Sequence, residues 1–190
     1  MRIFRLNADG ADEKFCFVEG AFAYDSGLQG GGAVLAEMKA DGVDVLEYQL
    51  DETQGGLEIG DYFSTTTNHL PLSRRFADAL ATKFTLGPHE LVPARIKNEK
   101  GRIHVKDAVI VNPLEGIDCL DWDQSELDGD AEDLMVRIFG KWSLKASRVP
   151  HDRDVFRVKG LIGYLFSERV VDFVHKQNFK NLEFEDAPLT

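Results

Sequence analysis

The chain uses one short pattern twice, with the two copies 94 residues apart. Residues 72–80 read Leu-Ser-Arg-Arg-Phe-Ala-Asp-Ala-Leu, and residues 166–174 read Phe-Ser-Glu-Arg-Val-Val-Asp-Phe-Val. Ser, Arg and Asp recur at the same offsets, and apolar residues recur at i, i+4, i+7 and i+8. That spacing places one apolar stripe on a helix, and Ser is a favoured N-cap. The sequence therefore predicts two similar amphipathic helices, each beginning at its Ser and packed on a sheet.

The repeated arginines, Arg75 and Arg169, fall in the first turn of each predicted helix, where the helix dipole disfavours a cation. Asp78 and Asp172 lie three residues further on, and pairing with them contributes roughly 0.2–0.5 kcal/mol. We therefore expect each arginine to have a tertiary partner as well. The interpretation favoured here is structural, and a ligand contact is the alternative.

Strand-like segments outnumber the helices, and most follow one another directly along the chain. The clearest pair is 90–96 and 103–111, joined by a turn at 98–101. Shorter strands are predicted at 2–6, 15–18, 43–50, 117–120, 134–139, 143–148, 155–158, 162–166 and 182–184, the last at a sheet edge. A glycine-rich loop at 26–32 precedes a helix at 33–40. This order predicts an α+β fold with a largely antiparallel sheet, in a single domain spanning 1–190.

Acidic residues concentrate in one segment. The net charge is −11, and residues 107–136 contain ten acids and no bases. Residues 71–106, by contrast, contain eight bases and three acids. Clustered carboxylates disfavour a nucleic-acid partner, because phosphates bind clustered Lys and Arg. They favour a basic protein partner, whose encounter they accelerate. A solvated acidic loop that aids solubility is the alternative.

The candidate partner-binding residues lie within this acidic segment. Trp122 stands between two aspartates, and we expect it to be exposed. An aromatic side chain surrounded by carboxylates is typical of a hot spot for a basic partner, whereas a tryptophan folded back on the core is the alternative. The candidate contact residues are Asp118, Asp121, Trp122, Asp123, Glu126, Asp128, Asp130, Glu132 and Asp133.

No spacing of reactive residues predicts a metal, cofactor or catalytic site. Asp121, Asp123, Ser125 and Glu132 stand at positions one, three, five and twelve of a calcium-loop template, but Glu126 replaces the glycine that the turn needs. The histidines lack HxxxH and HExxH spacings. We therefore expect no catalytic residue, metal or cofactor.

Two other function classes stay open at this point. A small hydrolase or transferase would need a His and carboxylate site assembled over long range, for example around His104 or His151. A structural module would oligomerise through an exposed sheet edge near the C-terminus.

The expected location follows from the termini, the apolar runs and the cysteines. Residues 1–6 are too short and too charged for a signal peptide, and the apolar runs are far shorter than a membrane span. Cys16 and Cys119 form no disulfide framework and are predicted to be buried thiols. We therefore expect a cytoplasmic protein with no membrane partner.

The ordered motifs resemble a known family. The motif residues are Ser73, Arg75, Asp78, Val111-Asn112-Pro113-Leu114, Ile117-Asp118-Cys119-Leu120-Asp121, Phe156-Arg157, Gly160, Phe166-Ser167 and Arg169. In this order they resemble immunity family eleven of the bacterial polymorphic-toxin systems, over residues 58–186. Residues 1–57 carry no matching motif and are predicted to be a variable part.

The resemblance implies a non-enzymatic immunity protein that binds and neutralises a cognate toxin, a secreted effector domain encoded beside it. The acidic segment suggests a basic toxin, and the expected location suggests a cytoplasmic target such as nucleic acid or nucleotide. A homodimer is compatible with this function.

Overall fold

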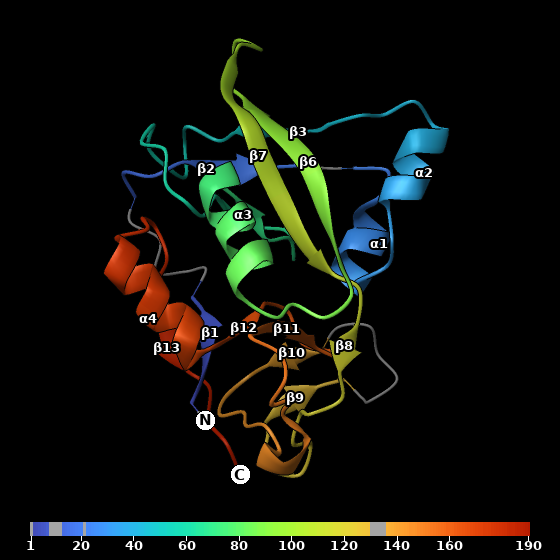
Figure 1. The fold of residues 1–190 in the computed structure, drawn as a ribbon, viewed down its shortest axis with the longest axis vertical. Helices are drawn as coiled ribbons and strands as arrows, with labels where there is room; N and C mark the ends of the chain where they lie inside the picture. Colours follow the sequence, from blue (N-terminus) through green and yellow to red (C-terminus); the bar gives the residue numbers. More distant parts are fainter. Residues whose placement is uncertain (1, 8–12, 21, 130–135) are drawn as a thin grey trace.

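The computed structural model describes residues 2–7, 13–20, 22–129 and 136–190 (Figure 1). The helices are α1 (Asp25–Gly30), α2 (Leu35–Ala40), α3 (Arg74–Lys83) and α4 (Glu168–Gln177), with a 3-10 turn at Ala146–Arg148. The strands are β1 (Ile3–Leu6), β2 (Phe17–Glu19), β3 (Leu46–Leu50), β4 (Ser64–Thr65), β5 (Pro71–Leu72), β6 (His89–Lys97), β7 (Ile103–Pro113), β8 (Gly116–Ile117), β9 (Leu127–Asp128), β10 (Arg137–Ile138), β11 (Val155–Val158), β12 (Leu165–Ser167) and β13 (Phe184–Asp186).

The strands form two main sheets and a small hairpin. The six-stranded sheet has the order β4-β2-β3-β6-β7-β5, the five-stranded sheet has the order β13-β1-β12-β11-β8, and β9 pairs with β10. Seven of the ten strand pairings are antiparallel, and β2–β4, β3–β6 and β8–β11 are parallel. The α+β class with largely antiparallel pairing is confirmed. The division between two sheets was not predicted.

The two repeated helices form where predicted and share one hydrophobic core. Phe76 and Leu80 of α3 are fully buried, as is Val170 of α4, and all three belong to one cluster. Leu72 of β5 and Phe166 of β12, the strands that precede the two helices, lie in the same cluster. Separate clusters lie between the six-stranded sheet and α1–α2, and between the five-stranded sheet and the segment that contains β9 and β10. Among the described helices, none is long and apolar enough to cross a membrane.

Two local predictions differ from the structure. The expected loop at 26–32 contains α1, because Leu28 is buried on the core and Gly31, at φ 76°, ends the helix in a left-handed turn. The expected strand at 143–148 reduces to single bridges at Leu144 before the 3-10 turn. The strands β1 and β2 form near the predicted positions, and they belong to different sheets.

The two cysteines are buried and unpaired, as predicted. Burial raises the pKa of Cys16 to about 11 and the pKa of Cys119 to about 12. Both thiols are therefore protonated and unreactive at neutral pH.

Candidate functional site

The first copy of the repeated pattern is held by a buried aspartate, Asp61. The Ser73 hydroxyl donates to Asp61 Oδ1 at 2.6 Å, and Arg75 Nη2 donates to Asp61 Oδ2 at 2.6 Å. The Lys180 backbone N–H, three residues past the end of α4, donates to Asp61 Oδ2 at 2.9 Å. The Arg75 guanidinium also lies 4.3 Å from the ring centre of Phe179. We call this set the first clamp.

The second copy repeats the arrangement around Asp154. The Ser167 hydroxyl donates to Asp154 Oδ1 at 2.6 Å, and Arg169 Nη1 lies 3.3 Å from Asp154 Oδ2. The Thr85 backbone N–H, two residues past the end of α3, donates to Asp154 Oδ2 at 3.0 Å. The Arg169 guanidinium lies 5.8 Å from the ring centre of Phe84. We call this set the second clamp.

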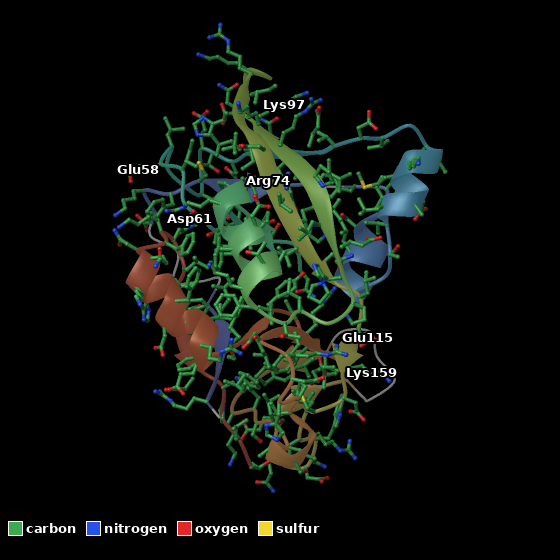
Figure 2. The ribbon with its side chains drawn as sticks, viewed as in Figure 1. Glu58, Asp61, Arg74, Lys97, Glu115 and Lys159 are labelled. Carbon is green, nitrogen blue, oxygen red and sulfur yellow. The ribbon has the colours of Figure 1, made fainter. Side chains whose placement is uncertain are left out.

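The two clamps are reciprocal, because each aspartate binds the start of one helix and the chain just past the end of the other. Figure 2 shows Asp61 between the start of α3 and the end of α4. The expected tertiary partners of the repeated arginines are therefore Asp61 and Asp154. The local partner predicted for Arg75, Asp78, instead lies 3.7 Å from Arg74.

The two serines differ as helix caps. The Ser73 hydroxyl accepts the Phe76 N–H at 3.2 Å, which confirms the predicted cap. Ser167 occupies the same position, but its side chain makes no cap hydrogen bond and donates to Asp154. The sequence carried a signal for both aspartates, because Asp61 precedes Ser73 by 12 residues and Asp154 precedes Ser167 by 13. Because the two spacings differ by one residue, an alignment of the two copies without a gap does not match Asp61 with Asp154.

The candidate contact residues have different surroundings. Asp123, Glu126 and Asp128 are exposed, and exposed Asp118 pairs with Arg148 at 3.0 Å. The remaining candidates in the acidic segment, Asp130, Glu132 and Asp133, lie outside the described residues.

Asp121 and Trp122 are less accessible than their acidic neighbours suggested. The Asp121 side chain is 9 % exposed, and it accepts a hydrogen bond from the Thr190 hydroxyl at 2.6 Å. This bond lowers the pKa of Asp121, and nearby Lys145 acts in the same direction. Trp122 is half-buried against the core, so the prediction of an exposed tryptophan is wrong. The exposed aromatic of this region is Phe139, at 71 %.

Phe139 lines an apolar groove of about 490 Å³ beside the β9–β10 pair. Trp142 and Ile162, which is 45 % exposed, also line the groove. Arg5 is another lining residue, and its guanidinium lies over the Trp142 ring, 5.6 Å from the ring centre. The Phe139 N–H donates to the Glu126 carbonyl at 3.0 Å. This bond, beside the β9–β10 pair, holds the aromatic residue next to exposed carboxylates. We call this surface the Phe139 groove.

The two histidines named as examples for an enzyme site, His104 and His151, have different surroundings. His151 is exposed, and His104 Nε2 lies 3.2 Å from the Leu57 carbonyl. Among the described residues, no group of three or more His, Cys, Asp or Glu side chains could hold a metal ion.

One other histidine, His69, does lie beside a carboxylate, but it is enclosed. His69 Nδ1 lies 2.9 Å from the Tyr48 hydroxyl, and Nε2 lies 3.6 Å from Asp25 Oδ1. Phe22 stacks on the ring with centroids 5.7 Å apart. A polar cavity of about 470 Å³ borders His69, but both ring nitrogens face protein atoms. The geometry therefore favours a structural, neutral histidine.

We expect acid to destabilise the protein through His69. Burial, with Arg157 nearby, lowers the pKa of His69 from 6.5 to about 4. The unfolded chain binds the proton between these values and the folded protein does not, so stability is complete above 6.5 and falls as the pH drops toward 4. The free energy of unfolding should fall by about 2 kcal/mol from about pH 7 to about pH 5, measured by urea denaturation. His69→Gln should remove most of this fall, and an equal fall in both proteins would assign it to other groups.

The chain matches a known protein family. Residues 45–188 match the model of an immunity protein family, Imm11. The match begins 13 residues before the expected boundary at 58 and contains both clamps and Phe139. A comparison with curated proteins found no match. The family match covers most of the chain and confirms the resemblance seen in the motifs, so the chain belongs to the immunity protein family Imm11.

Proposed function

We propose that this protein binds a cognate toxin domain in the cytoplasm and blocks the toxin's active site or its access to substrate. Membership of an immunity protein family supports a neutralising, non-enzymatic role. The observation that carries the binding mode is Phe139, which has the largest exposed fraction among the described large hydrophobic side chains. The toxin would cover Phe139 and the groove beside it.

The surroundings of Phe139 favour a basic partner. An apolar anchor with a polar rim is the usual arrangement of a binding hot spot. The rim here is acidic, because Asp123, Glu126 and Asp128 are exposed on the same hairpin region. A toxin that acts on nucleic acid needs clustered Lys and Arg to bind phosphates, and such a face would complement these carboxylates. Asp121 and Trp122 would support this surface from below.

Charge reversal tests the acidic rim. Converting Asp123, Glu126 and Asp128 together to Lys should slow association with the purified toxin at least about tenfold and reduce its salt dependence, because rim charges act mainly on the encounter rate. Association is measured by stopped-flow fluorescence, and protection is measured in cells that express the toxin. The toxin itself is identified by pulldown from the lysate of the protein's own organism.

A second triple variant provides the matched control. Asp44, Glu52 and Asp172 are also exposed acids, and they lie outside the acidic segment. Their conversion to Lys changes the net charge equally and should leave the association rate within a factor of about three. If both triple variants slow association equally, net charge and not the acidic rim controls the encounter. If neither affects binding or protection, the proposed contact surface is wrong.

For the possible homodimer, we propose pairing between two copies of β13. β13 forms an edge of the five-stranded sheet, as the sequence predicted, and its outer side is where a second copy would pair. The mass of the free protein in solution tests this stoichiometry.

A further inference from the structure

Strand β7 has an edge that is mostly unpaired. On one side, β6 pairs with β7 from His89–Pro113 to Lys97–Ile103. On the other side, β5 pairs only with Val109 and Ile110. Within the described ranges, no strand or backbone hydrogen bond covers residues 103–108 on that side. Unpaired N–H and C=O groups on a strand edge are a template for another strand.

The free edge of β7 lines a groove of about 410 Å³. The groove is lined by residues 103–107 and by Ile59, Phe63, Ser73 and Arg74. The groove exists because the chain leaves the sheet after β5 to begin α3. Figure 2 shows Arg74 at the start of α3, beside β7. An added strand in this groove would continue the line of β5.

Apolar side chains gather at this groove. Leu57, Ile59 and Ile103 are each more than half exposed, and they are three of the six large hydrophobic side chains with high exposure among the described residues. His104 Nε2 lies 3.2 Å from the Leu57 carbonyl and holds the 57–59 segment against the strand. Alternate side chains of an added strand would cover Ile59 and Ile103.

The charged side chains that line the groove favour some added strands over others. Arg74 and Lys106 line it, and Asp107 is the one acid among its lining residues. The stretch 71–106 has eight bases and three acids within a chain of net charge −11. A second copy of β7 on this edge would bring the two Lys106 side chains into the same interface, which like-charge repulsion disfavours. An acidic strand would be attracted by the same charges.

We propose that the free edge of β7 binds an extended, acidic segment of a partner protein as an added β-strand. Main-chain hydrogen bonds would supply affinity, Ile59 and Ile103 would take apolar side chains, and Arg74 and Lys106 would select acidic ones. The β6–β7 tip and the β9–β10 hairpin lie toward opposite ends of the long axis (Figure 1). This surface is therefore separate from the Phe139 groove and does not depend on the proposed toxin contact.

Hydrogen–deuterium exchange of the full chain tests the proposal. The probe is a synthetic peptide of alternating Val and Glu, and the control peptide alternates Val and Lys. The Glu peptide should slow deuterium uptake at residues 103–107, and the Lys peptide should not. In the double variant Arg74→Glu, Lys106→Glu, the Kd for the Glu peptide should rise at least about tenfold.

The matched control is Lys159→Glu with Lys176→Glu, two exposed residues away from this groove that give the same change in net charge. This variant should bind the Glu peptide as the parent does, and thermal unfolding verifies that both variants fold. Unchanged uptake at 103–107 under saturating Glu peptide, or equal protection by both peptides, overturns the proposal. A concentration-dependent dimer that protects these amides without peptide also overturns it.

Discussion

Phe139→Ser should weaken toxin binding by about 2–4 kcal/mol, or roughly thirty- to a thousandfold, while the protein stays folded. The binding loss is large because an aromatic anchor at the centre of an interface contributes much of its energy. The folding loss is small because Phe139 is 71 % exposed, and exposed side chains contribute little to the core. Titration calorimetry with the purified toxin measures the first effect, and urea denaturation measures the second.

Leu57→Ser is the matched control, because Leu57 is 59 % exposed and lies at the β7 groove. It loses a similar exposed apolar side chain and should leave toxin affinity within about threefold, or about 0.6 kcal/mol. Toxin affinity that falls with Leu57→Ser and not with Phe139→Ser would move the toxin site to β7. Equal losses of toxin affinity in the two variants would show that the toxin does not bind specifically at either groove.

Asp154→Ala should lower the free energy of unfolding by about 3–5 kcal/mol. The substitution leaves the Ser167 hydroxyl and the Thr85 N–H without their acceptor, and it removes the partner of Arg169. Asp154 is only 5 % exposed, so water cannot readily replace these bonds. Asp61→Ala should give a loss of the same order, because the first clamp has the same three kinds of contact.

Asp152→Ala is the control for the second clamp, since Asp152 is exposed and stands two residues before Asp154. Its effect should stay within about 0.5 kcal/mol. Urea denaturation of the three variants decides the matter, and a loss below about 1 kcal/mol for Asp154→Ala would contradict the clamp.

The repeated helices were predictable because their information is local. A stripe at helical spacing and a preceding Ser lie within nine residues in each copy. The long β6–β7 pair was predictable for the same reason, since only six residues join its predicted strands. The sheet partners of β1 were not, because β1 pairs with β12 and β13, at the other end of the chain. A strand of four residues carries no pattern that specifies so distant a partner.

The candidate site shows the same limit. The run of acidic residues predicted that this segment lies on the surface, and Asp123, Glu126 and Asp128 are exposed there. The acidic neighbours also suggested that Trp122 is exposed, but Trp122 packs against a hydrophobic cluster formed by residues distant in the sequence. The bonds of Asp121 to Thr190 and of Asp61 to Lys180 also join distant parts of the chain. Each missed feature depends on contacts between residues far apart in sequence.

The reciprocal clamps have a consequence for how such a protein can diversify. The clamps use side chains and backbone between residues 61 and 85 and between 154 and 180. Phe139 and Ile103 lie outside both ranges, since Phe139 follows β10 directly and Ile103 begins β7. Substitutions at these two positions can change the recognised partner with little effect on the clamps. A protein of this design can therefore evolve new specificities at its ends without losing the fold at its middle.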